Sequence, residues 1–223
     1  MKPARPLALA AVLAATGVAA SSASAATLAL DRACYVDGGS GGQTPINATA
    51  GGLAPGQTYN IGFTSKGSSG ETGYAYGTAD ASGALGFAMS SWYGGSTFKA
   101  QTYKATVVLR DSANNVLASA DTKTSSLQID VTGSGKYRKW KVTGLAALTG
   151  GTTYYAHYFN NNKYKGRLKI GKASGPCGVY TGKRPLTPFS KLGRYDVKVT
   201  TTKKWAAGDA FIGGRIVVTK RYR

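Results

Sequence analysis

Apolar and polar residues alternate in short runs along most of the chain, and turn residues separate the runs. Because side chains on a strand point alternately to the two faces of a sheet, such runs predict half-buried strands. No stretch beyond the first 20 residues has the 3.6-residue period of a helix. In the first half the pattern predicts strands at residues 27–32, 45–50, 58–63, 84–89, 104–110 and 116–122.

The second half repeats landmarks of the first at an offset of 92 residues. The tripeptide Gly-Leu-Ala stands at 52–54 and again at 144–146, and Tyr103 has a counterpart in Tyr195. A shared offset at both ends of a divergent middle predicts two copies of one unit. The Gly-x-Tyr-x-Val motif around Tyr195 is typical of the tyrosine corner in immunoglobulin-like folds. We therefore predict an all-β protein with two tandem immunoglobulin-like β-sandwich domains.

The positive charge of the chain is concentrated in its second half. Residues 26–127 carry six basic and six acidic side chains, whereas residues 128–223 carry twenty basic and three acidic ones. The formal net charge of the whole chain is +19. We predict a near-neutral domain at 26–126 and a strongly basic domain at 127–223.

Residues 1–25 have the three parts of a secretory signal peptide. Lys2 and Arg5 make a charged start, an apolar core follows at 7–20, and Ala-Ser-Ala at 23–25 is a cleavage site. We expect a secreted protein that is extracellular or loosely associated with the cell wall. No later stretch approaches the about 18–20 apolar residues that a membrane span needs, so we expect no transmembrane segment.

Basic residues recur at every second position in one segment and beside aromatic residues in others. On a strand, the cations of residues 163–169 would share one face at a spacing of roughly 6.6–7 Å. An anionic polymer or surface relieves the repulsion within such a row, and the alternative is a solvated face that keeps the domain soluble. Tyr137, Trp140 and Trp205 stand next to further cations. The residues predicted to bind an anionic partner are Lys139, Lys141, Lys163, Lys165, Arg167, Lys169 and Lys172.

His157 is the only histidine, and it lies in the aromatic run at 154–159. A catalytic histidine needs a nucleophile and an orienting acid, and a zinc site needs three or four ligands. The chain has no Gly-x-Ser-x-Gly motif and only three carboxylates in its second half. We predict a structural histidine and no catalytic residue, metal or cofactor. Two alternatives remain: a small-ligand cleft lined by Tyr155, His157 and Phe159, and an enzyme that uses His157.

The two cysteines, Cys34 and Cys177, lie one in each half. Secreted proteins seldom keep two free thiols in an oxidising compartment, so we predict a disulfide between them. In the chain-entropy model this bond would stabilise the protein by about 5 kcal/mol. It would also fix the angle between the domains. Two buried free thiols are the alternative.

Two resemblances support the sandwich fold. Residues 144–195, with Tyr-Ala-His-Tyr at 155–158, Gly-Pro-Cys-Gly at 175–178 and the motif at Tyr195, resemble a set of uncharacterised secreted actinobacterial proteins with tandem immunoglobulin-like modules. That resemblance implies the fold and no particular activity. The first half, at 51–59 and 78–83, is similar to neocarzinostatin-type sandwiches, which hold an enediyne chromophore in a cleft, but it lacks the two internal disulfides of that family.

The sequence thus predicts a secreted, non-catalytic binding protein. Its basic second domain would engage an anionic component of the cell envelope, either a wall polymer or lipid head groups. Nucleic acid is a further candidate partner, because the same backbone-dominated electrostatics would bind it.

Overall fold

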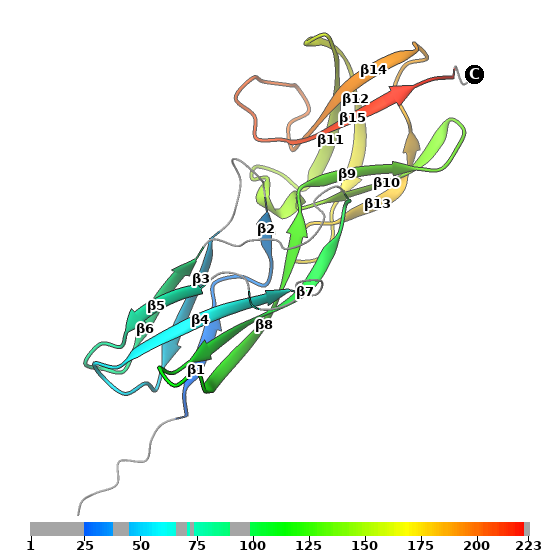
Figure 1. The fold of residues 1–223 in the computed structure, drawn as a ribbon. Helices are drawn as coiled ribbons and strands as arrows, with labels where there is room; N and C mark the ends of the chain where they lie inside the picture. Colours follow the sequence, from blue (N-terminus) through cyan, green and yellow to red (C-terminus); the bar gives the residue numbers. More distant parts are fainter. Residues whose placement is uncertain (1–24, 38–44, 66–70, 72–73, 90–98, 221–223) are drawn as a thin grey trace, which may run out of the picture.

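The structure is a computed structural model, and it describes residues 25–37, 45–65, 71, 74–89 and 99–220. Within these ranges the chain consists of strands, turns and one short 3₁₀ helix. Apart from Ala25, the predicted signal peptide lies outside them. Figure 1 shows two β-sandwiches that follow one another along the long axis of the molecule. The predicted all-β fold of two tandem sandwiches is confirmed.

The first sandwich pairs a three-stranded sheet, in the order β1-β3-β6, with a five-stranded sheet, in the order β2-β8-β7-β4-β5. All neighbours in these sheets are antiparallel except β2, which runs parallel to β8. Ile61, Phe63, Val107 and Leu109 point between the sheets and form the centre of the core. The strands are β1 (Thr27–Leu30), β2 (Tyr35–Asp37), β3 (Ile46–Gly51), β4 (Thr58–Ser65), β5 (Tyr74–Thr78), β6 (Leu85–Met89), β7 (Thr102–Arg110) and β8 (Val116–Ser126).

The second sandwich has the same plan. Its sheets have the orders β13-β10-β9 and β12-β11-β14-β15, which match β6-β3-β1 and β5-β4-β7-β8 strand for strand. Only β2 has no counterpart in the part of the second half that the structure describes. The elements are β9 (Gln128–Thr132), β10 (Tyr137–Thr143), a 3₁₀ helix (Leu145–Ala147), β11 (Thr153–Asn160), β12 (Lys163–Lys172), β13 (Tyr180–Pro185), β14 (Gly193–Thr200) and β15 (Ile212–Val218).

A shared turn geometry supports the internal repeat. The backbone N–H of Leu53 donates to the carbonyl oxygen of Gly83 at 3.1 Å, and Leu145 donates in the same way to Gly178 at 3.0 Å. Both glycines have a positive φ, of 76° and 63°. A Cβ at either position would overlap backbone atoms of the facing connection. Both turns therefore require glycine, because the backbone has a positive φ and because there is no room for a Cβ atom.

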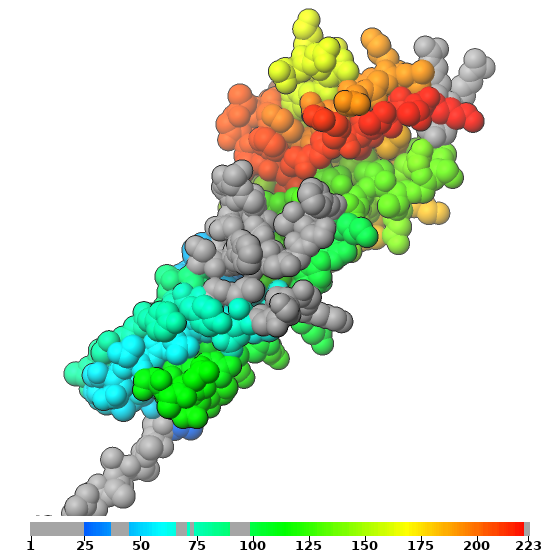
Figure 2. Space-filling view, viewed as in Figure 1, coloured from blue at the N-terminus to red at the C-terminus, as the bar shows by residue number. Residues whose placement is uncertain are grey.

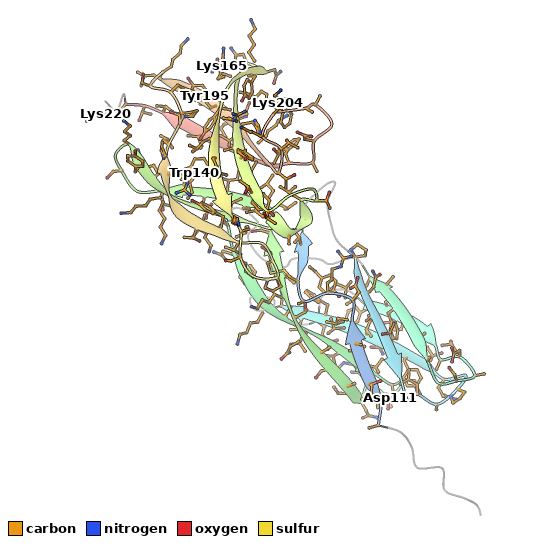
Figure 3. All side chains as sticks on the ribbon, turned by 180° about the vertical axis from the view of Figure 1, so that it is seen from behind. Asp111, Trp140, Lys165, Tyr195, Lys204 and Lys220 are labelled. Carbon is orange, nitrogen blue, oxygen red and sulfur yellow. A yellow bond between two sulfur atoms is a disulfide. The ribbon has the colours of Figure 1, made fainter. Side chains whose placement is uncertain are left out.

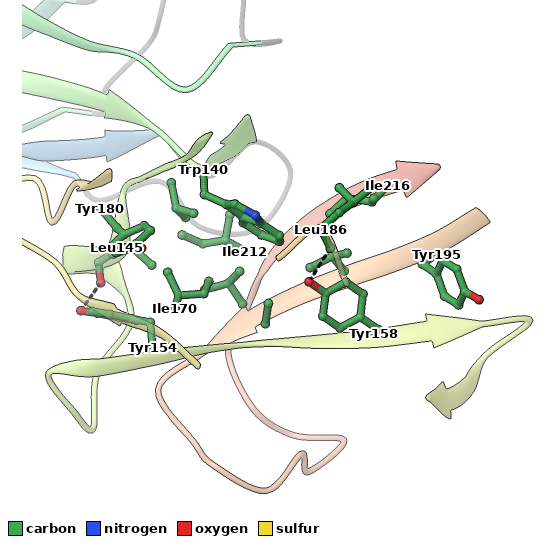
Figure 4. Close-up of a cluster of buried hydrophobic side chains, with 14 of the residues drawn as sticks. Trp140, Leu145, Tyr154, Tyr158, Ile170, Tyr180, Leu186, Tyr195, Ile212 and Ile216 are labelled. Atoms are coloured by element: carbon green, nitrogen blue, oxygen red, sulfur yellow. Dashed lines mark hydrogen bonds between the residues drawn. The ribbon is translucent and has the colours of Figure 1, made fainter. Parts of the chain in front are cut away.

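The core of the second sandwich contains four tyrosines, and three of them use the hydroxyl group to bond a backbone carbonyl oxygen (Figure 4). Tyr154 donates to the carbonyl oxygen of Leu145 at 3.1 Å, and Tyr158 donates to that of Leu186 at 2.9 Å. Tyr195 donates to the carbonyl oxygen of Lys191 at 3.1 Å. These bonds satisfy three of the buried hydroxyl groups, whereas the hydroxyl of Tyr180 has no hydrogen-bond partner among the described residues. The bond of Tyr195 confirms the predicted tyrosine corner.

A disulfide and several polar contacts join the two sandwiches. Cys34, between β1 and β2, bonds Cys177, in the turn between β12 and β13, with their Cα atoms 5.2 Å apart. The predicted disulfide is confirmed. Close by, Thr143 Oγ1 donates to the carbonyl oxygen of Ser126 at 2.7 Å, and the linking segment between β8 and β9 is a single residue, Leu127. The junction between the two sandwiches is therefore short and is held by a covalent bond.

Candidate anion-binding face of the second domain

Two bulges interrupt the pairing of β12 with β11. The register pairs Tyr155 with Lys169 and His157 with Arg167, but it then shifts by one residue, so that Phe159 pairs with Tyr164. Cross-strand partners share a face of a sheet, and each bulge reverses the alternation that follows it. Tyr164 therefore lies on the same face as His157, and their ring centroids are 6.1 Å apart.

The prediction that four alternating cations share one face is therefore wrong. Arg167 and Lys169 do lie together on the outer face of the four-stranded sheet, and Lys172 joins them because it pairs with Thr153. Lys163 pairs with Asn160 and lies on the other side of the sheet, while Lys165 is the extra residue of the bulge. Gly166 and Gly171 stand beside the two bulges with positive φ. Glycine within a predicted strand was the signal for these irregularities.

Lys139 and Lys141 do not join this face either. They lie on β10, in the three-stranded sheet, and the side chains between and beyond them, Trp140 and Val142, point into the core. Lys139 therefore faces outward on the opposite side of the sandwich, where it pairs with Lys183. The seven predicted residues consequently do not form one surface. Figure 3 shows Trp140 between the sheets and Lys165 and Lys204 at the far end of the second sandwich.

The connection between β14 and β15, residues 201–211, folds back over the outer face of the four-stranded sheet. We call it the 201–211 loop. Its Trp205 ring lies 5.8 Å from the ring of His157 and 5.1 Å from that of Phe159, centroid to centroid. His157 and Phe159 are both buried. The protein's own tryptophan thus packs against two of the three residues predicted to line a small-ligand cleft, and the binding of a small ligand there stays a prediction.

His157 holds the 201–211 loop in place. Its Nε2 lies 3.0 Å from the carbonyl oxygen of Thr202 and 3.1 Å from Thr200 Oγ1. Because a carbonyl oxygen can only accept, Nε2 carries the proton and Nδ1 is the unprotonated nitrogen. Burial lowers the pKa of His157 below its ordinary value of 6.5, and the charge of Arg167 acts in the same direction. The side chain is therefore neutral and structural.

Two further side chains anchor the same loop. Arg167 donates from Nη1 to the carbonyl oxygen of Lys203 at 2.8 Å. Asp209 Oδ2 accepts hydrogen bonds from Thr202 Oγ1 and from the backbone N–H of Ala206. These bonds favour the carboxylate and hold the pKa of Asp209 below its usual value. Side chains of β11, β12 and β14 thus bond the first residues of the loop to the sheet, and Asp209 bonds the second half of the loop to its first half.

Lys198, which the sequence analysis did not single out, is the cation at the centre of this face. Its Nζ lies 4.4 Å from the ring centroid of Phe211, 4.8 Å from that of Trp205 and 5.2 Å from that of Phe159. We call these three rings the ring cage. Phe211 is 43% exposed, so the cage is open to solvent on one side. The sequence pattern does not predict this arrangement, because one ring lies on β11 and the other two lie in the 201–211 loop, far from it in the sequence.

The outer face of the four-stranded sheet and the 201–211 loop are strongly positive. Both carboxylates there are engaged, Asp196 with Arg215 at 3.0 Å and Asp209 with the loop. The excess of cations is therefore not neutralised by the protein itself. The basic residues on this side, placed by register or by the loop, are Arg167, Lys169, Lys172, Arg194, Lys198, Lys203, Lys204 and Arg215.

Two specific features are absent from the described part of the chain. No group of three or more His, Cys, Asp or Glu residues there could hold a metal ion. No helix among the described residues is long and apolar enough to cross a membrane.

Comparison with known proteins finds solved structures with a weak likeness and no family. No family model matches the chain, and no curated protein matches it. The FN1–FN3 domains of chicken CNTN1 are 12% identical, over 86% of this chain and 65% of that one, with a TM-score of 0.27. Red sea bream transglutaminase is 13% identical, over 89% and 32%, with a TM-score of 0.32. A tetra-tandem repeat of a large adhesion protein is 11% identical, over 86% and 48%, with a TM-score of 0.29.

The chain therefore spans less than two thirds of the length of each of these three structures. At TM-scores of 0.27, 0.32 and 0.29, this likeness carries no argument about the fold of the chain or about what it binds.

Proposed function

We propose that this protein is a secreted, non-catalytic binding protein whose second domain attaches to an anionic polymer of the cell envelope. Buried cysteines joined in a disulfide are typical of proteins that fold outside the reducing cytosol. The resemblance to secreted actinobacterial proteins points to the same compartment. In that compartment a wall polymer is more accessible to the protein than an intracellular nucleic acid is.

The observation that carries the proposal is the unneutralised charge of the outer face of the four-stranded sheet. Eight basic side chains lie on that face and its loop, and both carboxylates beside them already have partners. When a polyanion binds this surface, the protein's basic side chains replace the counterions condensed on the polymer. The release of those counterions into solution favours binding. The bulge in β12 excludes Lys163 and Lys165 from this binding surface, and the position of β10 in the other sheet excludes Lys139 and Lys141.

The test is co-sedimentation of the purified protein with isolated bacterial cell walls over a range of salt concentrations. We expect binding at about 50 mM NaCl and nearly complete release at about 500 mM, with log K falling linearly against log salt. Walls stripped of their phosphate polymers are the control and should retain much less protein. Retention that does not respond to salt, or equal retention on stripped walls, would contradict the proposal.

A further inference from the structure

Lys198 differs from the other cations of the second domain in its place in the sheet. The cations of β12 lie on an edge strand, and lysines on edge strands serve to block pairing with other chains. Lys198 lies on β14, which is hydrogen-bonded to β11 on one side and to β15 on the other. Protection of the sheet edge therefore accounts for the cations of β12, but it does not account for Lys198.

The ring cage fixes the position of this ammonium group. Three rings surround Nζ within 5.2 Å, a range in which the electron-rich ring faces attract a cation. No carboxylate within the described residues forms an ion pair with Lys198. Asp196, two residues earlier on the same face, is bonded to Arg215 instead. Lys198 is thus a positive charge that the rings hold in place and that has no ion-pair partner among the described residues.

A second cation stands in register with it. His157 pairs with Lys198 on β14 and with Arg167 on β12, so the three residues form one row across the face. With strands about 4.8 Å apart, the Cα atoms of Arg167 and Lys198 lie about 10 Å from each other. Arg167 is oriented by its bond to Lys203, which uses one of the five N–H donors of a guanidinium. His157, between them, is neutral and adds no competing charge.

We propose that the ring-caged ammonium of Lys198, together with the guanidinium of Arg167, is the specific binding site for phosphodiester groups of a linear polymer without aromatic bases. This inference rests on the proposed function and names the site and the ligand chemistry. An ammonium binds a phosphate oxygen as a point charge and needs no fixed fork geometry, whereas a planar carboxylate is matched best by paired N–H donors.

The rings themselves argue against a nucleic acid at this site. Single-stranded nucleic acids bind to exposed ring faces, on which successive bases stack. Here the ring faces are turned toward Lys198, and the rings meet edge to face, at 73° between Phe159 and Trp205 and 64° between Trp205 and Phe211. The ring faces that contact Nζ are therefore not available to a base.

The test measures binding of the purified protein to poly(glycerol phosphate) at about 100 mM NaCl. Lys198→Met keeps the aliphatic stem among the rings and removes the charge, and we expect it to weaken binding about tenfold. Lys139→Met removes one charge from the opposite side of the sandwich and should weaken binding less than about twofold. Phe211→Leu keeps every charge, removes the nearest ring and should cost about two- to fivefold. Thermal melting of each variant verifies that it is folded, and Lys198→Gln replaces Lys198→Met if the latter is not.

Each alternative outcome has a distinct meaning. Equal losses for the Lys198 and Lys139 variants would overturn the specific site and leave the proposed function standing, because binding would then depend only on total charge. Absence of binding by the unaltered protein to both the polymer and cell walls would overturn both. Equally tight, Lys198-dependent binding of single-stranded DNA, of a uronate polysaccharide or of phosphatidylglycerol vesicles would overturn the ligand class.

Discussion

The Nε2 of His157 donates a hydrogen bond to the carbonyl oxygen of Thr202 over 3.0 Å, and this bond ties the 201–211 loop to the sheet below it. The opposite nitrogen, Nδ1, is buried and has no hydrogen-bond partner among the described residues. Protonation would place a charge on a buried ring that stands between Arg167 and Lys198. The folded protein therefore holds this histidine in its neutral form.

This arrangement makes stability depend on pH in a defined direction. Burial lowers the pKa of His157 below 6.5 in the folded state, so the unfolded chain binds a proton first as the pH falls. Stability should decline from about pH 6.5 downward to the lowered pKa. We expect the melting temperature to fall between pH 7.5 and pH 5.5, and His157→Gln, which cannot titrate, to lose most of that dependence. Carboxylates titrate mainly below about pH 4 and do not enter this window. An equal decline in the variant would show that another group is responsible.

The disulfide should contribute a large share of the stability. Cys34 and Cys177 are 143 residues apart, and closing a loop of this length stabilises by about 5 kcal/mol in the chain-entropy model. We expect the double variant Cys34→Ala, Cys177→Ala to unfold at a clearly lower urea concentration and to populate a state with only one domain unfolded. Either single cysteine variant should match the double variant once its remaining thiol is blocked. A urea midpoint unchanged from that of the native protein would contradict the prediction.

Much of the fold was predictable because the strands carry a local signal. The runs expected at 58–63 and 104–110 correspond to β4 and β7, each with alternating buried positions and a strong apolar set. The strand β5 was missed because its core-facing positions are Ala75 and Gly77, which give no apolar signal. The strand β2 was missed for another reason: it has three residues and pairs with a segment about 90 positions later.

The candidate site was predictable only in part. Alternation in β12 correctly brought Arg167 and Lys169 to one face, but a bulge beside Gly166 removed Lys163 from it. A one-residue slip reverses every later side chain, so a face derived from strict alternation fails wherever the ladder is irregular. The position of Trp205 over His157 depends on how a loop folds back across the sheet, and local pattern contains no information about that.

The turn between β11 and β12 sets the register on which the face depends. Asn161 and Asn162 both have positive φ, at 49° and 59°, as a two-residue hairpin turn of the primed type requires. Asn162→Ala should lower the free energy of unfolding by about 1 kcal/mol, because alanine is strained in this conformation. Asn162→Gly should be neutral or slightly stabilising. Urea titration of the three proteins measures both differences, and equal stability of the alanine and glycine variants would contradict the assignment of strain.

In the turn that contains Cys177, two glycines allow the cost of backbone strain to be measured apart from the cost of steric overlap. Gly175 and Gly178 both have a positive φ, of 72° and 63°. A Cβ at Gly175 meets no atom within 4 Å, whereas one at Gly178 would overlap the backbone of Leu145 and Ala146. Gly175→Ala should therefore cost only the strain, about 1–2 kcal/mol. Gly178→Ala should cost at least about 2 kcal/mol more, because the bond from Leu145 to the Gly178 carbonyl must also shift.

The counterpart in the first sandwich provides the matched pair. Gly56 has a φ of 72° with open space around it, and Gly83 faces the backbone of Leu53. If the two sandwiches are copies of one unit, Gly83→Ala and Gly178→Ala should destabilise their own domains by similar amounts. Gly56 lies in the β3–β4 connection and is not the counterpart of Gly175, so Gly56→Ala serves as the variant of the first domain that introduces backbone strain without steric overlap. Urea unfolding followed by hydrogen exchange assigns each loss to a domain. If Gly178→Ala left the stability unchanged while Gly83→Ala lowered it, the two turns would differ in their need for glycine although their hydrogen bonds are alike.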